Sequence, residues 1–148
     1  MKKILIATDG SETAHAAIVA GLELAAEDNA EVVFVHVTSA LEFPSAASGS
    51  EAPERLPRIE TDAVLLDALE QARKCKVPAR AELLIGFAPK QIIRLARDIE
   101  ADLIVVGSRG HGRVKRAVLG STSRTVLAKA DRPVMVVRET DVREPVEA

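Results

Sequence analysis

The sequence predicts an α/β protein with a doubly wound, five-stranded parallel sheet and helices on both of its faces. Short runs rich in β-branched residues alternate with stretches in which apolar residues recur at helical spacing. Residues 31–38, EVVFVHVT, are apolar with almost no alternation, which is typical of a strand covered on both faces. A length of 148 residues fits one domain with a sizeable core. We therefore expect residues 1–148 to form a single domain.

The first half of the chain predicts two strands around one helix. The strands are expected from Lys3 to Thr8 and from Glu31 to Thr38. Ser11 is expected to cap the helix between them, because its hydroxyl can accept from a free N–H of the first turn, and Asn29 is expected to end it. Residues 39–60, rich in Ser, Ala, Pro and Glu, predict a long mobile surface connection, either a lid or a tolerated insertion.

The next helix and strand are expected to lie towards one edge of the sheet. Thr61 or Asp62 is expected to cap a helix whose apolar stripe ends near Cys75. The following strand is expected from Val77 to Ile85. Because Pro78 cannot donate to a strand ladder, we expect this strand near the sheet edge.

The last third of the chain predicts two helices and two strands. Pro89 is expected in the first turn of a helix, where its missing N–H breaks no hydrogen bond. The fourth strand is expected from Leu103 to Val106 and the fifth from Val134 to Val137, with a helix that begins near residues 120–121 between them. Residues 139–148 are charged, bury little and are expected to form a frayed tail.

Composition excludes several classes of partner. The 20 basic and 22 acidic side chains nearly balance, and three phenylalanines are the only aromatic residues, so we expect no nucleic-acid binding. The apolar run that begins at Ile4 stops at Thr8, too early for a signal peptide or a membrane span, so we expect a cytoplasmic protein and no membrane partner. Cys75 is the only cysteine, which excludes an internal disulfide.

A glycine-spaced, basic and hydroxyl-rich loop follows the fourth strand and predicts a phosphate site. Phosphate recognition needs inward N–H groups, small residues and positive potential. Glycines allow positive φ and close approach of a ligand to the main chain. His111, Arg113 and Ser123 are further candidates for phosphate contacts, although basic side chains in such a loop more often face solvent. The glycines and hydroxyls of the loop are Gly107, Gly110, Gly112, Gly120, Ser121, Thr122 and Ser123.

The carboxyl ends of parallel strands meet at one edge of a sheet, and ligands bind there where the strand order reverses. Asp9, Val37 and the glycine loop should therefore share one crevice if strands one and four are neighbours. Asp9 either accepts from a ribose hydroxyl or a metal there, or closes the turn with Gly10, and position alone does not separate these roles. His36 is interpreted as a hydrogen-bonded core histidine.

Two common phosphate motifs are missing. The sequence contains no GxxxxGK(S/T), which excludes a P-loop NTPase, and the turn after the first strand lacks GxGxxG, which disfavours a dinucleotide site. The glycines lie after the fourth strand instead.

From Lys3 to about Arg138 the chain resembles the universal stress protein family. Gly107, Gly110 and Gly120-Ser121 reproduce the G-x2-G-x9-G-(S/T) pattern of its ATP-binding members. The opening ILIATDGSE, the segment DLIVVGSRG and the closing RPVMVV fit the same family.

The resemblance implies a flavodoxin-like or adenine nucleotide α-hydrolase-like sheet of order 3-2-1-4-5, with ATP bound between strands one and four. It also implies ADP or AMP as alternative nucleotides, and Mg²⁺ or Mn²⁺ bound with them. Asp9 corresponds to the acidic residue near the ribose or metal, and Val37 to the position whose backbone contacts adenine. The other implied nucleotide-binding residues are Thr8, Val106, Gly107, Arg109, Gly110, Gly120, Ser121 and Thr122.

Family members pair their fifth strands across a dimer axis. The resemblance therefore implies a homodimer whose interface contains Val134, Met135, Val136 and Val137. As bare sequence, these residues are also an apolar sheet edge that needs cover.

Three functions follow as hypotheses. The first is an ATP-binding stress-response dimer that acts on a regulatory protein partner and hydrolyses ATP slowly at most, since the sequence shows no convincing water-activating base or arginine finger. The second is a dimeric scaffold of the same fold that does not use nucleotide. The third is a true ATPase or nucleotidyl enzyme.

Overall fold

The computed structural model describes residues 1–39, 58–109 and 119–139. Several expectations concern residues outside these ranges. They are the phosphate contacts of Gly110, His111 and Arg113, most of the long connection after the second strand, and the tail after Glu139.

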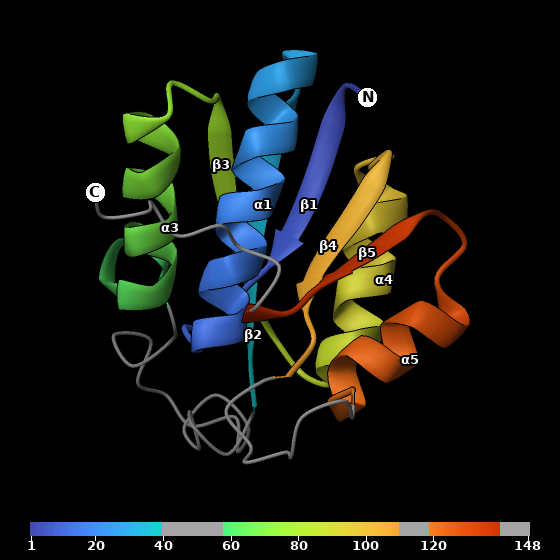
Figure 1. The fold of residues 1–148 in the computed structure, drawn as a ribbon. Coiled ribbons are helices and arrows are strands. Elements are labelled where there is room, and N and C mark those ends of the chain that lie inside the picture. Colours follow the sequence, from blue (N-terminus) through green and yellow to red (C-terminus); the bar gives the residue numbers. More distant parts are fainter. Residues whose placement is uncertain (40–57, 110–118, 140–148) are drawn as a thin grey trace.

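Five parallel strands form one sheet in the order β3-β2-β1-β4-β5, as predicted (Figure 1). The order reverses between β1 and β4, so these two neighbours lead to connections that leave on opposite sides of the sheet. The bounds of the strands are Lys3–Ala7 for β1, Glu31–Thr38 for β2, Ala79–Ile85 for β3, Leu103–Gly107 for β4 and Val134–Val137 for β5.

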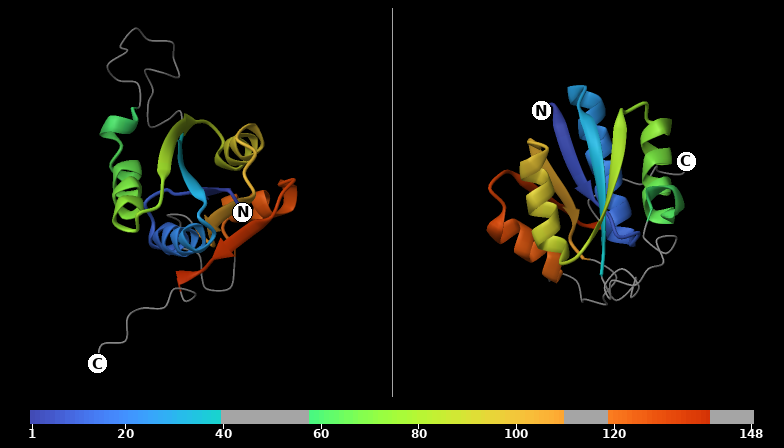
Figure 2. Two further views of the ribbon diagram at one scale, coloured as in Figure 1. Left: turned by 90° about the horizontal axis from the view of Figure 1, so that it is seen from above. Right: turned by 180° about the vertical axis from the view of Figure 1, so that it is seen from behind.

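The helices cover both faces of the sheet (Figure 2). α1, Glu12–Asp28, and α3, Ala63–Lys74, pack on one face, and α4, Ala88–Asp98, and α5, Ser121–Lys129, pack on the other. Among the described residues, no helix is both long and apolar enough to cross a membrane.

The helix boundaries follow the predicted capping residues. The hydroxyl of Ser11 accepts from the N–H of Ala14 at 3.2 Å, and Asn29 ends α1 in the left-handed conformation with φ 54°. Asp62, rather than Thr61, caps α3 by accepting from the N–H of Leu65 at 2.9 Å. The sequence predicted these boundaries because each capping residue forms its hydrogen bond within the helix end that it caps.

Four predicted boundaries differ from the structure by one or two residues. β1 ends at Ala7 instead of Thr8, and β4 ends at Gly107 instead of Val106. The irregular connection does not extend to Glu60, because Ile59–Thr61 form a 3-10 helix, η3, just before α3. β3 begins at Ala79 instead of Val77, although the carbonyl of Pro78 still accepts from the N–H of Val32 at 2.9 Å. The predicted edge position of β3 is confirmed.

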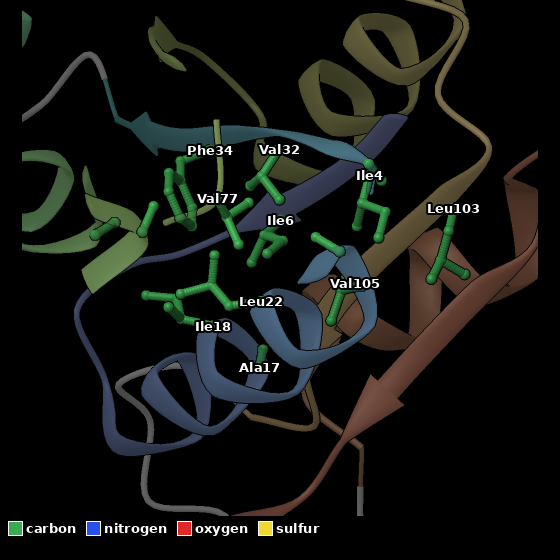
Figure 3. Close-up of a cluster of buried hydrophobic side chains, with 14 of the residues drawn as sticks. Ile4, Ile6, Ala17, Ile18, Leu22, Val32, Phe34, Val77, Leu103 and Val105 are labelled. Atoms are coloured by element: carbon green, nitrogen blue, oxygen red, sulfur yellow. The ribbon is translucent and has the colours of Figure 1, made fainter. Parts of the chain in front are cut away.

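Side chains of alternate residues in the central strands pack against the helices on opposite faces of the sheet. Ile4 and Ile6 of β1 pack towards α1 together with Phe34, whereas Leu5 packs towards α4 and α5 (Figure 3). All four side chains are fully buried. This two-sided core holds the carboxyl ends of β1 and β4 in a fixed position next to each other.

Candidate functional site

A crevice of about 370 Å³ opens at the carboxyl ends of β1 and β4, where the strand order reverses. Its volume lies within the range of small-molecule sites, roughly 300–1,000 Å³. All predicted site residues that the structure describes, apart from the strand β5 interface, line this one crevice. They are Thr8, Asp9, Val37, Val106, Gly107, Arg109, Gly120, Ser121, Thr122 and Ser123.

One wall of the crevice is apolar, and sequence reasoning found only part of it. Val37 and Val106 come from strand ends and were predicted. Ala88 and Ile92 of α4 were missed, although both lie in the early turns of a helix that follows a strand and so could have been expected near the ligand edge. Ala7, Ala14 and Val35 were missed as well.

The turn after β1 brings a carboxylate to the opposite side of the crevice. The N–H of Thr8 donates to the carbonyl of Val35 at 2.9 Å, which continues the sheet pairing past β1. Oδ1 of Asp9 accepts from the N–H of Ser11 at 2.9 Å, and Gly10 takes φ 82°. The turn-closing role considered for Asp9 is therefore confirmed, and its side chain also lines the crevice.

The start of α5 forms the polar end of the crevice. Gly120 is its N-cap, and no side chain of the described residues caps the first turn, so the first N–H groups of the helix lie beside the hydroxyls of Ser121 and Thr122. The buried hydroxyl of Ser123 instead donates to the carbonyl of Ser108 at 2.9 Å. An uncapped helix start of this kind favours an anion.

One part of the role predicted for two loop glycines, a positive φ, is wrong. Gly120 has φ −66°, and Gly107 is not among the described residues with positive φ, so neither uses the left-handed conformation. A Cβ on Gly107 would stand 2.7 Å from the carbonyl carbon and oxygen of Thr13. At Gly107 the main chain thus approaches helix α1, and the small residue is required by helix packing.

Arg109 supplies a cation at the mouth of the crevice. Its carbonyl accepts from the hydroxyl of Thr13, and its Nη2 lies 3.3 Å from Oε1 of Glu139. The two charged side chains are 30% and 41% exposed. Arg109 therefore already holds one carboxylate, and a phosphate would compete for the same guanidinium.

A larger hollow, of about 670 Å³, lies between the start of α1 and α3. Carboxylates of Glu12, Asp67 and Glu139 line it, with His15. Three carboxylates would repel a phosphate, whereas the smaller crevice offers free N–H groups and Arg109. The smaller crevice is the better candidate for an anionic ligand.

His36 belongs to neither cavity. Its Nδ1 lies 3.0 Å from Oδ2 of Asp62, and the two side chains are only 15% and 12% exposed. The interpretation of His36 as a hydrogen-bonded core residue is confirmed. Among the residues that the structure describes, no three His, Cys, Asp or Glu side chains gather as metal ligands.

A parallel sheet of this order, with a crevice at its point of reversal, defines a doubly wound α/β protein. The model of the universal stress protein family matches residues 1–138. The chain belongs to the universal stress protein family.

Individual relatives agree with this assignment. Universal stress protein MJ0531 of Methanocaldococcus jannaschii is 34% identical over 140 residues, which cover 93% of this chain and 82% of the relative. The solved structure of hypothetical protein MJ0577 is similar with a TM-score of 0.79 and 27% identity, and covers 93% of this chain and 95% of its own. The universal stress protein from Archaeoglobus fulgidus, solved in complex with dAMP, has a TM-score of 0.69 and 26% identity, covering 93% and 98%.

Proposed function

We propose that this protein is a single-domain, cytoplasmic homodimer that binds ATP, or ADP or AMP in its place, and thereby changes how it meets a regulatory protein partner. One observation carries the proposal. An apolar wall, a carboxylate and an uncapped helix start converge in one crevice at the reversal of the sheet. These are the surfaces that a base, a ribose and a phosphate chain require.

The apolar wall suits an adenine ring. Val37, Val106 and Ile92 offer aliphatic side chains from two strands and a helix, and the strand ends place backbone groups beside them for the edge of the base. The dAMP bound by the Archaeoglobus fulgidus relative supports an adenine nucleotide.

The polar end suits the phosphates. Free N–H groups of the first turn of α5 and the hydroxyls of Ser121 and Thr122 would donate to phosphate oxygens, and Arg109 would offset their charge. Mg²⁺ or Mn²⁺ bound with the nucleotide would neutralise further phosphate charge, and Asp9 is the residue that would help to hold it.

The crevice is poorly equipped for rapid hydrolysis. Among its described lining residues, Asp9 and Arg109 are the ionisable ones, and Oδ1 of Asp9 accepts from the N–H of Ser11. Phosphoryl transfer is fast only where a residue orients the attacking water and cations stabilise the transferring group. We therefore propose slow ATP hydrolysis at most.

The proposal is tested first on the purified protein. Denaturing it should release ATP, ADP or AMP, and ATP with Mg²⁺ should raise the Tm of nucleotide-free protein. No released nucleotide together with no thermal shift would favour the scaffold function. Rapid steady-state turnover that is abolished by Asp9→Asn would favour the enzyme.

A pair of variants in one helix tests the crevice itself. Thr122→Val keeps the size of the side chain and removes a hydroxyl from the crevice, so the Kd for ATP should rise about tenfold. Thr125→Val makes the same change one turn later, outside the crevice, and should alter the Kd by less than about twofold. Equal effects of both variants in calorimetric titration would contradict the proposed site.

A further inference from the structure

Charge is segregated between the two helical layers. α1 and α3 carry six acidic and two basic side chains, whereas α4 and α5 carry five basic and one acidic. The formal charge of the whole chain, −2, conceals this separation. The face formed by α4 and α5 is therefore strongly positive on a weakly negative protein.

A groove of about 510 Å³ runs between α4 and α5, which lie side by side (Figures 1 and 2). Lys90, Arg94 and Arg97 follow each other at three- and four-residue spacing on α4 and therefore share one side of that helix. Lys129 of α5 adds a cation on the facing wall, and Ile93 lies between the α4 cations.

An exposed aromatic residue stands at one end of the groove. Phe87 directly precedes α4 and is 66% exposed, whereas the core residue Phe34 is fully buried. Its position at the helix cap involves no side-chain hydrogen bond. An exposed aromatic ring beside cations is a frequent anchor for a binding partner.

Most of the groove cations lack an ionic partner within the described ranges. Lys90, Arg94 and Lys129 are exposed, and no acidic side chain among the described residues lies within ion-pair distance of them. Arg97 is the exception, because its Nε lies 3.5 Å from Oδ2 of Asp131. Asp98 also lines the groove, so its lining holds four basic side chains and one acidic side chain, with Phe87 and Ile93 as the large apolar residues. The groove therefore carries net positive charge beside an apolar surface.

We propose that this groove docks an acidic protein segment that carries an apolar or aromatic anchor. The cations of α4 from position 90 to 97 span about 10 Å, which matches a short peptide segment. Phe87 and Ile93 would receive the anchor, and the cations would pair with the carboxylates around it. A nucleic acid would favour several stacking aromatics, and a membrane would favour several protruding apolar side chains, so an acidic peptide fits this surface better.

The groove is separate from the nucleotide crevice. Helices α4 and α5 contribute to both cavities, but the cavities share no described lining residue. On α4, for example, Ala88 and Ile92 line the crevice, whereas Ile93 lines the groove. Variants in the groove should therefore leave nucleotide affinity unchanged.

The test measures fluorescence anisotropy of a short labelled peptide of Asp and Glu that contains one Phe and one Leu a helical turn apart. The full chain should bind it at low salt. Lys90→Glu/Arg94→Glu should weaken binding about tenfold or more, and Phe87→Ser about fivefold, with serine retaining a favourable cap for α4. The control Lys2→Glu/Lys74→Glu reverses the same number of exposed charges elsewhere and should change binding less than about twofold.

The following outcomes would contradict the proposed docking of an acidic segment. Absence of peptide binding at low salt overturns it, as does equal binding of a peptide with Ser in place of Phe and Leu, because the anchor would then be irrelevant. Equal weakening by the control variant also overturns it. Binding of single-stranded DNA or of phosphatidylserine vesicles without binding of the peptide would assign the groove to another class of partner.

Discussion

The carbonyl oxygen of Thr13 lies 2.7 Å from the place that a Cβ on Gly107 would occupy. Both groups belong to the backbone, so neither can rotate away. The close approach lets the end of β4 pack directly on the first turn of α1, beside the candidate crevice.

Gly107→Ala should therefore destabilise the protein by about 1–3 kcal/mol, because strand and helix must move apart. Gly120→Ala is the matched control. Gly120 has φ −66° and ψ 165°, which any residue adopts, so its replacement should change the free energy of unfolding by less than about 1 kcal/mol. Urea unfolding of both variants measures the difference, and equal losses would contradict the packing role of Gly107.

Ser123 connects the start of α5 to the end of β4. The residue is 2% exposed, and its hydroxyl donates to the carbonyl of Ser108, which also accepts from the N–H of Gly120 at 2.7 Å. Ser123→Ala should lower the free energy of unfolding by about 1 kcal/mol, because one hydrogen bond is lost while the carbonyl keeps a partner.

Ser121→Ala is the informative comparison for that variant. Ser121 is exposed at the first position of α5, so its loss should leave stability nearly unchanged and weaken ATP binding instead. Thermal unfolding and calorimetric titration of the two variants separate the roles. A stability loss confined to Ser121→Ala would contradict both assignments.

Local patterns in the sequence predicted the helices and strands because the ends and the burial of each element depend on residues that are close in the sequence. Ser11, Asp62 and Asn29 act within one helical turn, and the apolar run 31–38 is buried on both faces as its pattern indicates. The rule for parallel sheets also predicted that Asp9, Val37 and the two described ends of the glycine loop lie together. Their common crevice follows from topology alone.

The features that the sequence did not predict depend on contacts between segments that are far apart in the chain. The pattern of glycines did not reveal that Gly107 packs against the backbone of Thr13. Ala88 and Ile92 reach the crevice only because α4 packs on the face of the sheet that also carries Val35 and Val106. Net charge likewise gave no sign of the basic face, since opposite charges on the other layer cancel it.

The carboxyl group of Asp102 lies at the other end of the sheet and makes the free energy of unfolding depend on pH. Its Oδ2 accepts from the N–H groups of Lys2 and Lys3 at 2.8 and 3.0 Å. These hydrogen bonds, that from Lys2 foremost, lower the pKa of the carboxyl below its usual value of 3.8. The folded state therefore binds this proton less readily than the unfolded state.

The stabilisation from Asp102 should be complete above the usual pKa of an aspartate, about 3.9, and should be lost as pH falls through the lower folded-state pKa. Asp102→Asn should reduce the Tm at pH 7. The difference in Tm between this variant and the unsubstituted protein should disappear as both are acidified towards pH 2. Melting curves across this range provide the measurement. A gap that stays constant with pH would show that the charge of Asp102 does not contribute.

Within the described ranges, strand β5 pairs with β4 on one side only, and two hydrogen bonds define which backbone groups face the other side. The N–H of Ile104 donates to the carbonyl of Pro133 at 3.0 Å, and that of Ser108 to the carbonyl of Val137 at 2.8 Å. Backbone groups alternate sides along a strand, so the N–H and carbonyl of Val136 point away from β4. An unpaired row of this kind is where a second copy would add its own strand.

Val136→Pro should therefore separate the proposed homodimer into monomers. Proline removes the N–H that faces the free edge and leaves the groups that pair with β4 in place, so the sheet should remain folded. Val136→Thr keeps the β-branched shape and the N–H, and it should remain dimeric. Sedimentation velocity measures the association state, with circular dichroism to confirm the fold. A dimer of unchanged affinity in folded Val136→Pro would show that the subunits do not associate through the edge of β5.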